Sequence, residues 1–175
     1  MKGSSRVSEN SPRMNRRRTC LVLCAAMLLA VCCLSDSLGQ GQTTTAQQIA
    51  TLNRFADTLA DRSGDLIEMR PVSGGDDYHS ATLMAHIASS VRVMAESVAS
   101  QLELYRTART AADRAKMRPI INRWTQYCAK RIGSGITILN SDISTIGSPG
   151  LAATGTQLRD DLRRLKVYLE SLKLK

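Results

Sequence analysis

Aromatic residues are scarce in this 175-residue chain, where phenylalanine, tryptophan and tyrosine together make up 3%. A protein that binds single-stranded nucleic acid by stacking needs exposed rings between its cations. The chain has few rings for such a platform, and this argues against nucleic acid as a partner.

Histidine is also rare, with His79 and His86 as the two examples. Seven helical residues separate them by about 10.5 Å along the axis, too far for both to chelate one metal ion. No Gly-x-Ser-x-Gly elbow, phosphate-binding P-loop or His-Glu-x-x-His motif occurs. We therefore expect no enzymatic activity and no metal site, and we name no catalytic residue.

A small-ligand or haem carrier is the alternative function that the composition leaves open. Methionine and histidine serve as axial ligands of haem, and Met84 and His86 lie in one predicted helix. The Cys-x-x-Cys-His motif for covalent haem attachment is absent. Since methionines at core spacing also fill gaps between helices, we expect packing here and keep non-covalent haem or metal as the alternative.

Cysteine is concentrated at the start of the chain, with four of five within residues 1–39. There, three consecutive arginines precede a 15-residue apolar run, and small and polar residues follow it. This order is typical of a secretory signal peptide. We predict a signal over residues 1–39 and a periplasmic or secreted protein. The run is shorter than the about 20 residues that span a bilayer, and an uncleaved membrane anchor is the alternative. Translation starts at Met1 or Met14.

Cys128 is the one cysteine of residues 40–175, so this part of the chain can form no internal disulfide. Free cysteine commonly behaves as a small buried hydrophobe, and we expect that role. The alternative is an intermolecular disulfide that makes a homodimer.

Residues 40–175 predict an all-α domain, an antiparallel up-down-up-down four-helix bundle. Apolar residues recur at three- and four-residue spacing in four segments, and no segment alternates with period two. The clearest stripe is that of the last segment, at Leu151, Leu158, Leu162, Leu165, Leu169 and Leu172.

The expected helix ends follow from capping residues, prolines and glycines. We expect a capping box of Thr45 and Gln48 at the first helix, which Pro71 stops. Asp76 or Asp77 caps the second helix, which bends or ends within 106–116. Pro119 starts or kinks the third helix, Gly147 ends it, and Ser148 and Pro149 begin the fourth. Gly133 and Gly135 interrupt the third apolar stripe, and they indicate a close helix contact, a kink or a short break there.

Basic residues cluster between positions 106 and 131, where eight cations accompany one anion, Asp113. The excess of seven is larger than that of residues 40–175 as a whole, which hold 18 basic and 13 acidic residues. The candidate binding residues are Arg106, Arg109, Arg114, Lys116, Arg118, Arg123, Lys130 and Arg131.

The expected bundle places this cluster at one pole, so we predict a non-enzymatic interaction module. Its partner would be an anionic membrane surface, an envelope polymer or an acidic protein. The plainer interpretation is a solvated basic face that aids solubility. A row of acidic residues on the first helix (Asp57, Asp61, Asp65 and Glu68) is interpreted as solvated too.

Overall fold

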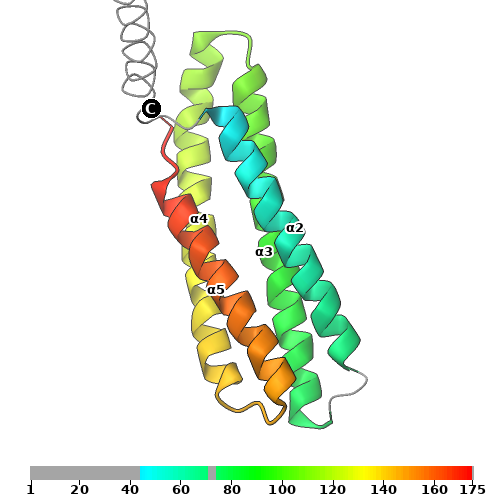
Figure 1. Ribbon diagram of the computed structural model, residues 1–175. Coiled ribbons are helices and arrows are strands. Elements are labelled where there is room, and N and C mark those ends of the chain that lie inside the picture. Colours follow the sequence, from blue (N-terminus) through cyan, green and yellow to red (C-terminus); the bar gives the residue numbers. More distant parts are fainter. Residues whose placement is uncertain (1–43, 71–73, 175) are drawn as a thin grey trace, which may run out of the picture. The chain divides into compact units, whose positions relative to one another are not determined.

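The computed structural model describes residues 44–70 and 74–174, and the predicted signal lies outside them. Within these ranges the chain forms four helices and no strand (Figure 1). This confirms the expected all-helical fold. The helices are α2 (Thr45–Met69), α3 (Asp76–Thr107), α4 (Ala111–Ile143) and α5 (Pro149–Ser171).

The four helices pack as two close pairs. Helix α2 packs most extensively against α3, and α4 packs most extensively against α5. Fewer contacts join α3 to α4 and α2 to α5. Helices α2 and α4 do not contact each other. The α3–α4 connection lies at the same end as the start of α2 and the residues after α5 (Figure 1). At that end, the Asn122 side chain bonds both backbone groups of Leu174, and the Tyr168 hydroxyl donates to the Gln48 carbonyl.

One apolar stripe of each helix forms the core. Leu158, Leu162 and Leu165 of α5 are fully buried, as their spacing predicts. Each such burial stabilises the fold by about 1.5–3 kcal/mol. Cys128 of α4 is also fully buried, and this burial raises the pKa of its thiol to about 11. The expectation of a small buried hydrophobe at Cys128 is confirmed.

The start of α2 corrects the expected capping box by one residue. The N-cap is Thr44, whose hydroxyl accepts from the Gln47 backbone N–H at 3.3 Å. The Gln47 side chain in turn accepts from the Thr44 N–H at 2.8 Å. Thr44 has the extended backbone that a cap requires, while Thr45 is already helical.

The start of α3 also differs from the expectation, because neither Asp76 nor Asp77 caps it. The N-cap is Gly75, whose φ of 54° favours glycine, and it provides no side-chain cap. Asp77 instead accepts hydrogen bonds from the backbone N–H groups of Gly147 and Ser148, at 3.0 and 2.8 Å. The carboxylate therefore joins α3 to the α4–α5 connection.

Helix α4 begins eight residues earlier than Pro119, so Pro119 does not start it. Thr110 caps α4 by accepting from the Asp113 N–H at 3.0 Å, and Pro119 lies inside the helix. Proline leaves the carbonyl of Ala115 without its helical donor. Ala115 and Pro119 are both exposed, so water can reach that carbonyl.

The other ends agree in part with the expectations. Helix α3 ends at Thr107, inside the predicted window, and Ser148 caps α5 with Pro149 in its first turn. Helix α4 runs without a break through Gly133–Gly135, and it ends at Ile143 rather than at Gly147. The two glycines leave room for neighbours, since a Cβ on Gly135 would lie 3.4 Å from Ile87 of α3.

Candidate functional site

The eight predicted cations follow one long stretch of the bundle rather than one pole. Arg106 lies in the last turn of α3, Arg109 lies in the α3–α4 connection, and the other six lie on α4. From Ala111 to Arg131 α4 extends about 30 Å at 1.5 Å per residue. No residue between 103 and 120 is fully buried, and in this segment Tyr105 and Met117 pack against the edge of the core.

Two of the cations are engaged by neighbours. Arg106 forms a two-bond ion pair with Glu103, at 2.6 Å between Nη2 and Oε1 and 2.9 Å between Nε and Oε2. This pairing lowers the pKa of Glu103 and raises the pKa of Arg106, in both cases chiefly through the side-chain hydrogen bond. Arg114 donates to the carbonyl of Ala108, which caps the end of α3. Both groups serve the local structure around the α3–α4 connection.

Three other cations form a row along the outer face of α4. Lys116, Arg123 and Lys130 are spaced by seven residues, so they lie nearly in line at intervals of about 10.5 Å. All three are exposed, and none has an acidic partner among the described residues. We call Lys116, Arg123 and Lys130 the cation row.

The remaining cations do not belong to this row. Arg131 is exposed and lies about 80–100° around α4 from Arg123 and Lys130, close to the direction of Trp124. Arg118 is half-buried and lies about 120° around α4 from Trp124, on another face. Arg109 is exposed in the connection beyond the end of α4. The structure therefore aligns Lys116, Arg123 and Lys130 on one face of α4, and it places the other five predicted cations outside this row.

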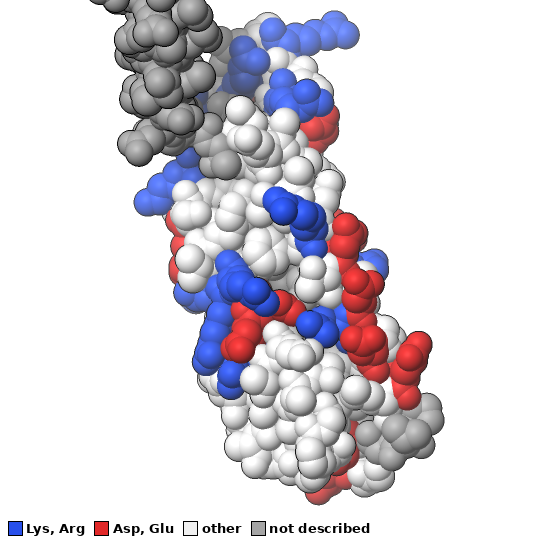
Figure 2. All heavy atoms as spheres, viewed as in Figure 1, with Lys and Arg blue, Asp and Glu red and all other residues white. Residues whose placement is uncertain are grey.

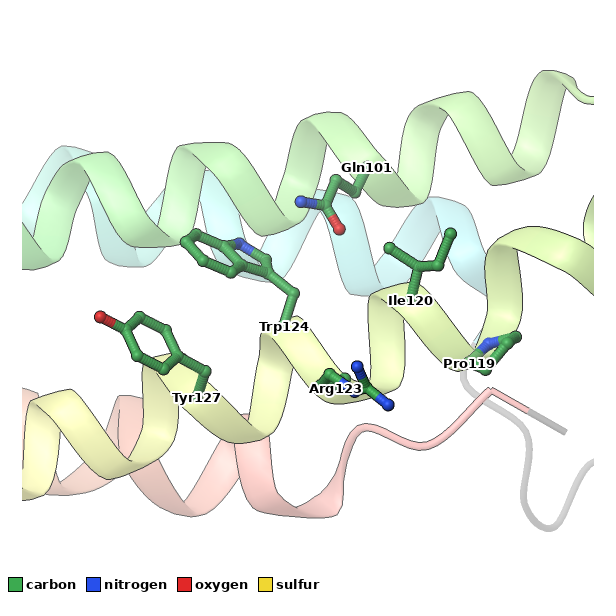
Figure 3. Close-up of a pocket in the computed structure, with 6 residues that line it drawn as sticks. All are labelled: Gln101, Pro119, Ile120, Arg123, Trp124 and Tyr127. Atoms are coloured by element: carbon green, nitrogen blue, oxygen red, sulfur yellow. The ribbon is translucent and has the colours of Figure 1, made fainter.

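An apolar groove of about 550 Å³ runs beside the cation row, between α3 and α4. Figure 3 shows Gln101 reaching from α3 toward Ile120 and Trp124 of α4. Ile120 is 65% exposed and Tyr127 is 49% exposed. The Trp124 and Tyr127 rings stack with centroids 5.3 Å apart. We call this feature the α3–α4 groove; its lining residues are Gln101, Pro119, Ile120, Arg123, Trp124 and Tyr127.

Two buried polar atoms in the groove lack hydrogen-bond partners. They are the indole Nε1 of Trp124, which can only donate, and the Oε1 of Gln101, which can only accept. Buried polar groups are normally paired, and each unpaired group costs about 1–3 kcal/mol. Because one atom is a donor on α4 and the other an acceptor on α3, a side-chain rotation that pairs them would relieve this cost, so the two atoms do not by themselves indicate an occupant.

The acidic residues of α2 lie elsewhere on the bundle. Asp57, Asp61, Asp65 and Glu68 are all exposed, and Figure 2 shows acidic side chains in a row along α2. Because α2 and α4 do not contact each other, this row and the cation row belong to separate faces. The acidic row of α2 and the cation row of α4 therefore do not neutralise each other.

The residues considered for a cofactor have other surroundings. Met84 is fully buried, and its sulfur would lie 2.7 Å from a Cβ on Gly155, so it packs directly on the α5 backbone. His79 and His86 are both exposed. Within residues 44–70 and 74–174, no three histidine, cysteine, aspartate or glutamate side chains gather as a metal site.

A membrane-crossing segment is not found in the described part either. None of the four helices there combines the length and the apolar composition needed to traverse a bilayer.

Trp124 is the functional candidate that the sequence interpretation missed, because its position in the third apolar stripe suggests a core residue. It is half-buried, with its ring in the groove and its stacking partner exposed. The seven-residue repeat of Lys116, Arg123 and Lys130 is the signal that could have located this surface. No protein-family model, curated protein or solved structure matches the chain.

Proposed function

We propose that the protein is an exported, non-enzymatic helical bundle that binds an anionic membrane surface through the cation row and the α3–α4 groove. In this proposal a signal peptide covers residues 1–39, and the four helices run up-down-up-down and antiparallel. The positive segment and apolar run at the start of the chain support export. The contacts between the start of α3 and the α4–α5 connection support the topology.

The observation that carries the proposal is the pairing of unneutralised cations with exposed apolar side chains on one helix face. Anionic headgroups attract each nearby lysine or arginine by about 1 kcal/mol. Tryptophan and tyrosine favour the boundary between headgroups and acyl chains, where an apolar ring and a polar edge are both accommodated. Arg123 belongs to both the row and the groove, so one docked orientation would use both.

A face used only for solubility would not need apolar groups among its charges. Ile120 and Tyr127 are large, exposed and placed between members of the cation row. Exposed single apolar residues are ordinary on protein surfaces, but a groove that gathers several of them beside cations is typical of an interaction site.

The test is binding of residues 40–175 to vesicles of phosphatidylglycerol and phosphatidylcholine at low ionic strength, measured by co-sedimentation. A variant with Lys116→Gln, Arg123→Gln and Lys130→Gln should bind about a hundredfold more weakly, since three cations contribute about 1 kcal/mol each. Pure phosphatidylcholine vesicles and high salt should abolish binding of the unmodified protein as well.

A matched control removes three cations elsewhere. Arg70→Gln, Arg159→Gln and Arg163→Gln give the same net charge, and none of these residues lies in the cation row or lines the groove. This control should bind almost as well as the unmodified protein. Equal weakening of both variants would show that only net charge matters, and no binding by the unmodified protein would refute the proposed function.

A further inference from the structure

A second charged hollow, of about 430 Å³, lies between α2 and α5. Three guanidinium groups line it, those of Arg54, Arg62 and Arg164, together with one carboxylate, that of Asp161. Figure 2 shows basic and acidic side chains meeting over the α2–α5 groove. We call Arg54, Arg62, Arg164 and Asp161 the arginine pocket. Because α2 does not contact α4, this pocket and the α3–α4 groove lie on opposite sides of the bundle.

Part of the pocket has a structural role. Asp161 is only 5% exposed, and it accepts from Arg62 Nε at 3.3 Å and from Arg164 Nη2 at 2.5 Å. A buried carboxylate needs such partners, so the Arg62–Asp161 pair holds α5 against α2. One of the three positive charges is thereby neutralised inside the pocket.

The guanidinium groups of Arg54 and Arg164 carry positive charge that the single carboxylate of the pocket does not neutralise. Arg54 donates to the Thr51 hydroxyl at 3.2 Å and has no acidic partner among the described residues. Arg164 is 71% exposed, which leaves much of its guanidinium open to solvent. Asp65 lies 3.7 Å from Arg62, but its own side chain is 53% exposed on the solvent side. The lining residues therefore carry a net charge of two positive units toward the hollow.

The composition of the wall is suited to a small anionic molecule. Guanidinium groups bind phosphate oxygens through two parallel hydrogen bonds, which a lone ammonium cannot do. The Thr51 hydroxyl accepts from Arg54 and also hydrogen-bonds the Tyr168 side chain, so it helps to hold Arg54 at the edge of the hollow. Phe55 adds a half-buried apolar wall, fixed by its contact with Tyr168 at 5.9 Å between ring centroids.

We propose that the arginine pocket binds the phosphate group of a small phosphomonoester, with Arg54 and Arg164 as the residues that contact it. A dianionic phosphate balances the two excess charges of the lining. Arg62 keeps its bond to Asp161 and adds long-range attraction. The phosphate could belong to a soluble metabolite or to a phosphatidic acid headgroup, because both present the same terminal group.

The test is isothermal titration of residues 40–175 with inorganic phosphate and, separately, with short-chain phosphatidic acid below its micelle concentration. Both should bind saturably at one site. Arg54→Gln should weaken binding about tenfold or more, the loss expected for a hydrogen bond to a charged group. Arg163→Gln is the matched control, because Arg163 is an exposed neighbour of Arg164 that pairs with Asp160 and does not line the pocket.

The outcomes separate the two sources and the two proposals. Equal affinity for both probes assigns a soluble phosphate, and tighter binding of phosphatidic acid assigns a lipid headgroup. Thermal unfolding of Arg54→Gln without ligand should match that of the unmodified protein, since Arg54 is exposed. Lack of saturable binding of either probe, or equal weakening by Arg54→Gln and Arg163→Gln, would overturn the inference. Neither result bears on vesicle binding through the cation row.

Discussion

Asp77 offers the sharpest test of how the bundle is held together, because its carboxylate joins segments 70 residues apart. Both oxygens are used, one for the Gly147 N–H at 3.0 Å and one for the Ser148 N–H at 2.8 Å. A hydrogen bond to a charged group contributes about 1.5–3 kcal/mol. Gly147 is exposed, so water replaces part of its bond, and we expect Asp77→Ala to cost about 2–4 kcal/mol in all.

The neighbouring Asp76 is a matched control for this substitution. It occupies the same first turn of α3, it is exposed, and its carboxylate bonds no donor among the described residues. Asp76→Ala should therefore lose only the favourable interaction with the helix dipole, about 0.3–1 kcal/mol. Urea unfolding followed by circular dichroism gives both free energies of unfolding. A difference between the two variants below about 0.5 kcal/mol would refute the role given to Asp77.

Two further predictions concern packing and burial. Gly64→Ala should stabilise the protein by about 0.5–1 kcal/mol in urea unfolding, because nothing lies within 4 Å of the new Cβ. In the same measurement, Gly155→Ala should destabilise the protein by about 1–3 kcal/mol, because its Cβ would lie 2.7 Å from the buried Met84 sulfur. Burial raises the pKa of Cys128 from 9.0 to about 11, so stability should be constant below pH 9 and fall as pH rises toward 11, since the unfolded thiol ionises first. Cys128→Ala should remove the contribution of this thiol to the fall of stability between pH 9 and 11. If the thiol of the native protein reacted with Ellman's reagent at pH 8 as fast as that of the unfolded protein, the burial of Cys128 would be contradicted.

The buried face of α5 could be predicted from the sequence because it depends on spacing alone. Leucines at three- and four-residue intervals lie on one side of any helix, whatever packs against them. Leu158, Leu162 and Leu165 are accordingly all fully buried. Ser148 and Pro149 were predictable at the start of α5 for a similar reason, because their preferences are local.

Features that depend on distant segments could not be predicted in this way. Asp77 has the composition of a helix cap, and only the arrival of the α4–α5 connection makes it an acceptor for Gly147 and Ser148. Three consecutive threonines, at positions 43–45, stand where α2 begins, so the sequence alone does not decide which of them caps it. Pro119 suggests a helix start, yet Thr110 provides a better one upstream.

The candidate surface was predicted in charge but not in shape. The count of cations between 106 and 131 did not include Glu103, which neutralises Arg106 from three residues before it. Side-chain geometry decides which cations remain without an acidic partner, and a count of charges along the sequence holds no information on that geometry. Trp124 packs against the edge of the core, as its place in the apolar stripe predicts, and its additional exposure to the groove depends on how closely α3 and α4 approach each other.

Trp124 also provides the most direct measurement of the central claim, because it is the one tryptophan of the chain and lies in the α3–α4 groove. Its fluorescence should shift to shorter wavelength and become less accessible to acrylamide when residues 40–175 meet phosphatidylglycerol vesicles at low ionic strength. The change should disappear in high salt and in the variant that lacks the cation row. An emission spectrum and a quenching constant unchanged by saturating anionic vesicles would contradict membrane binding through this surface.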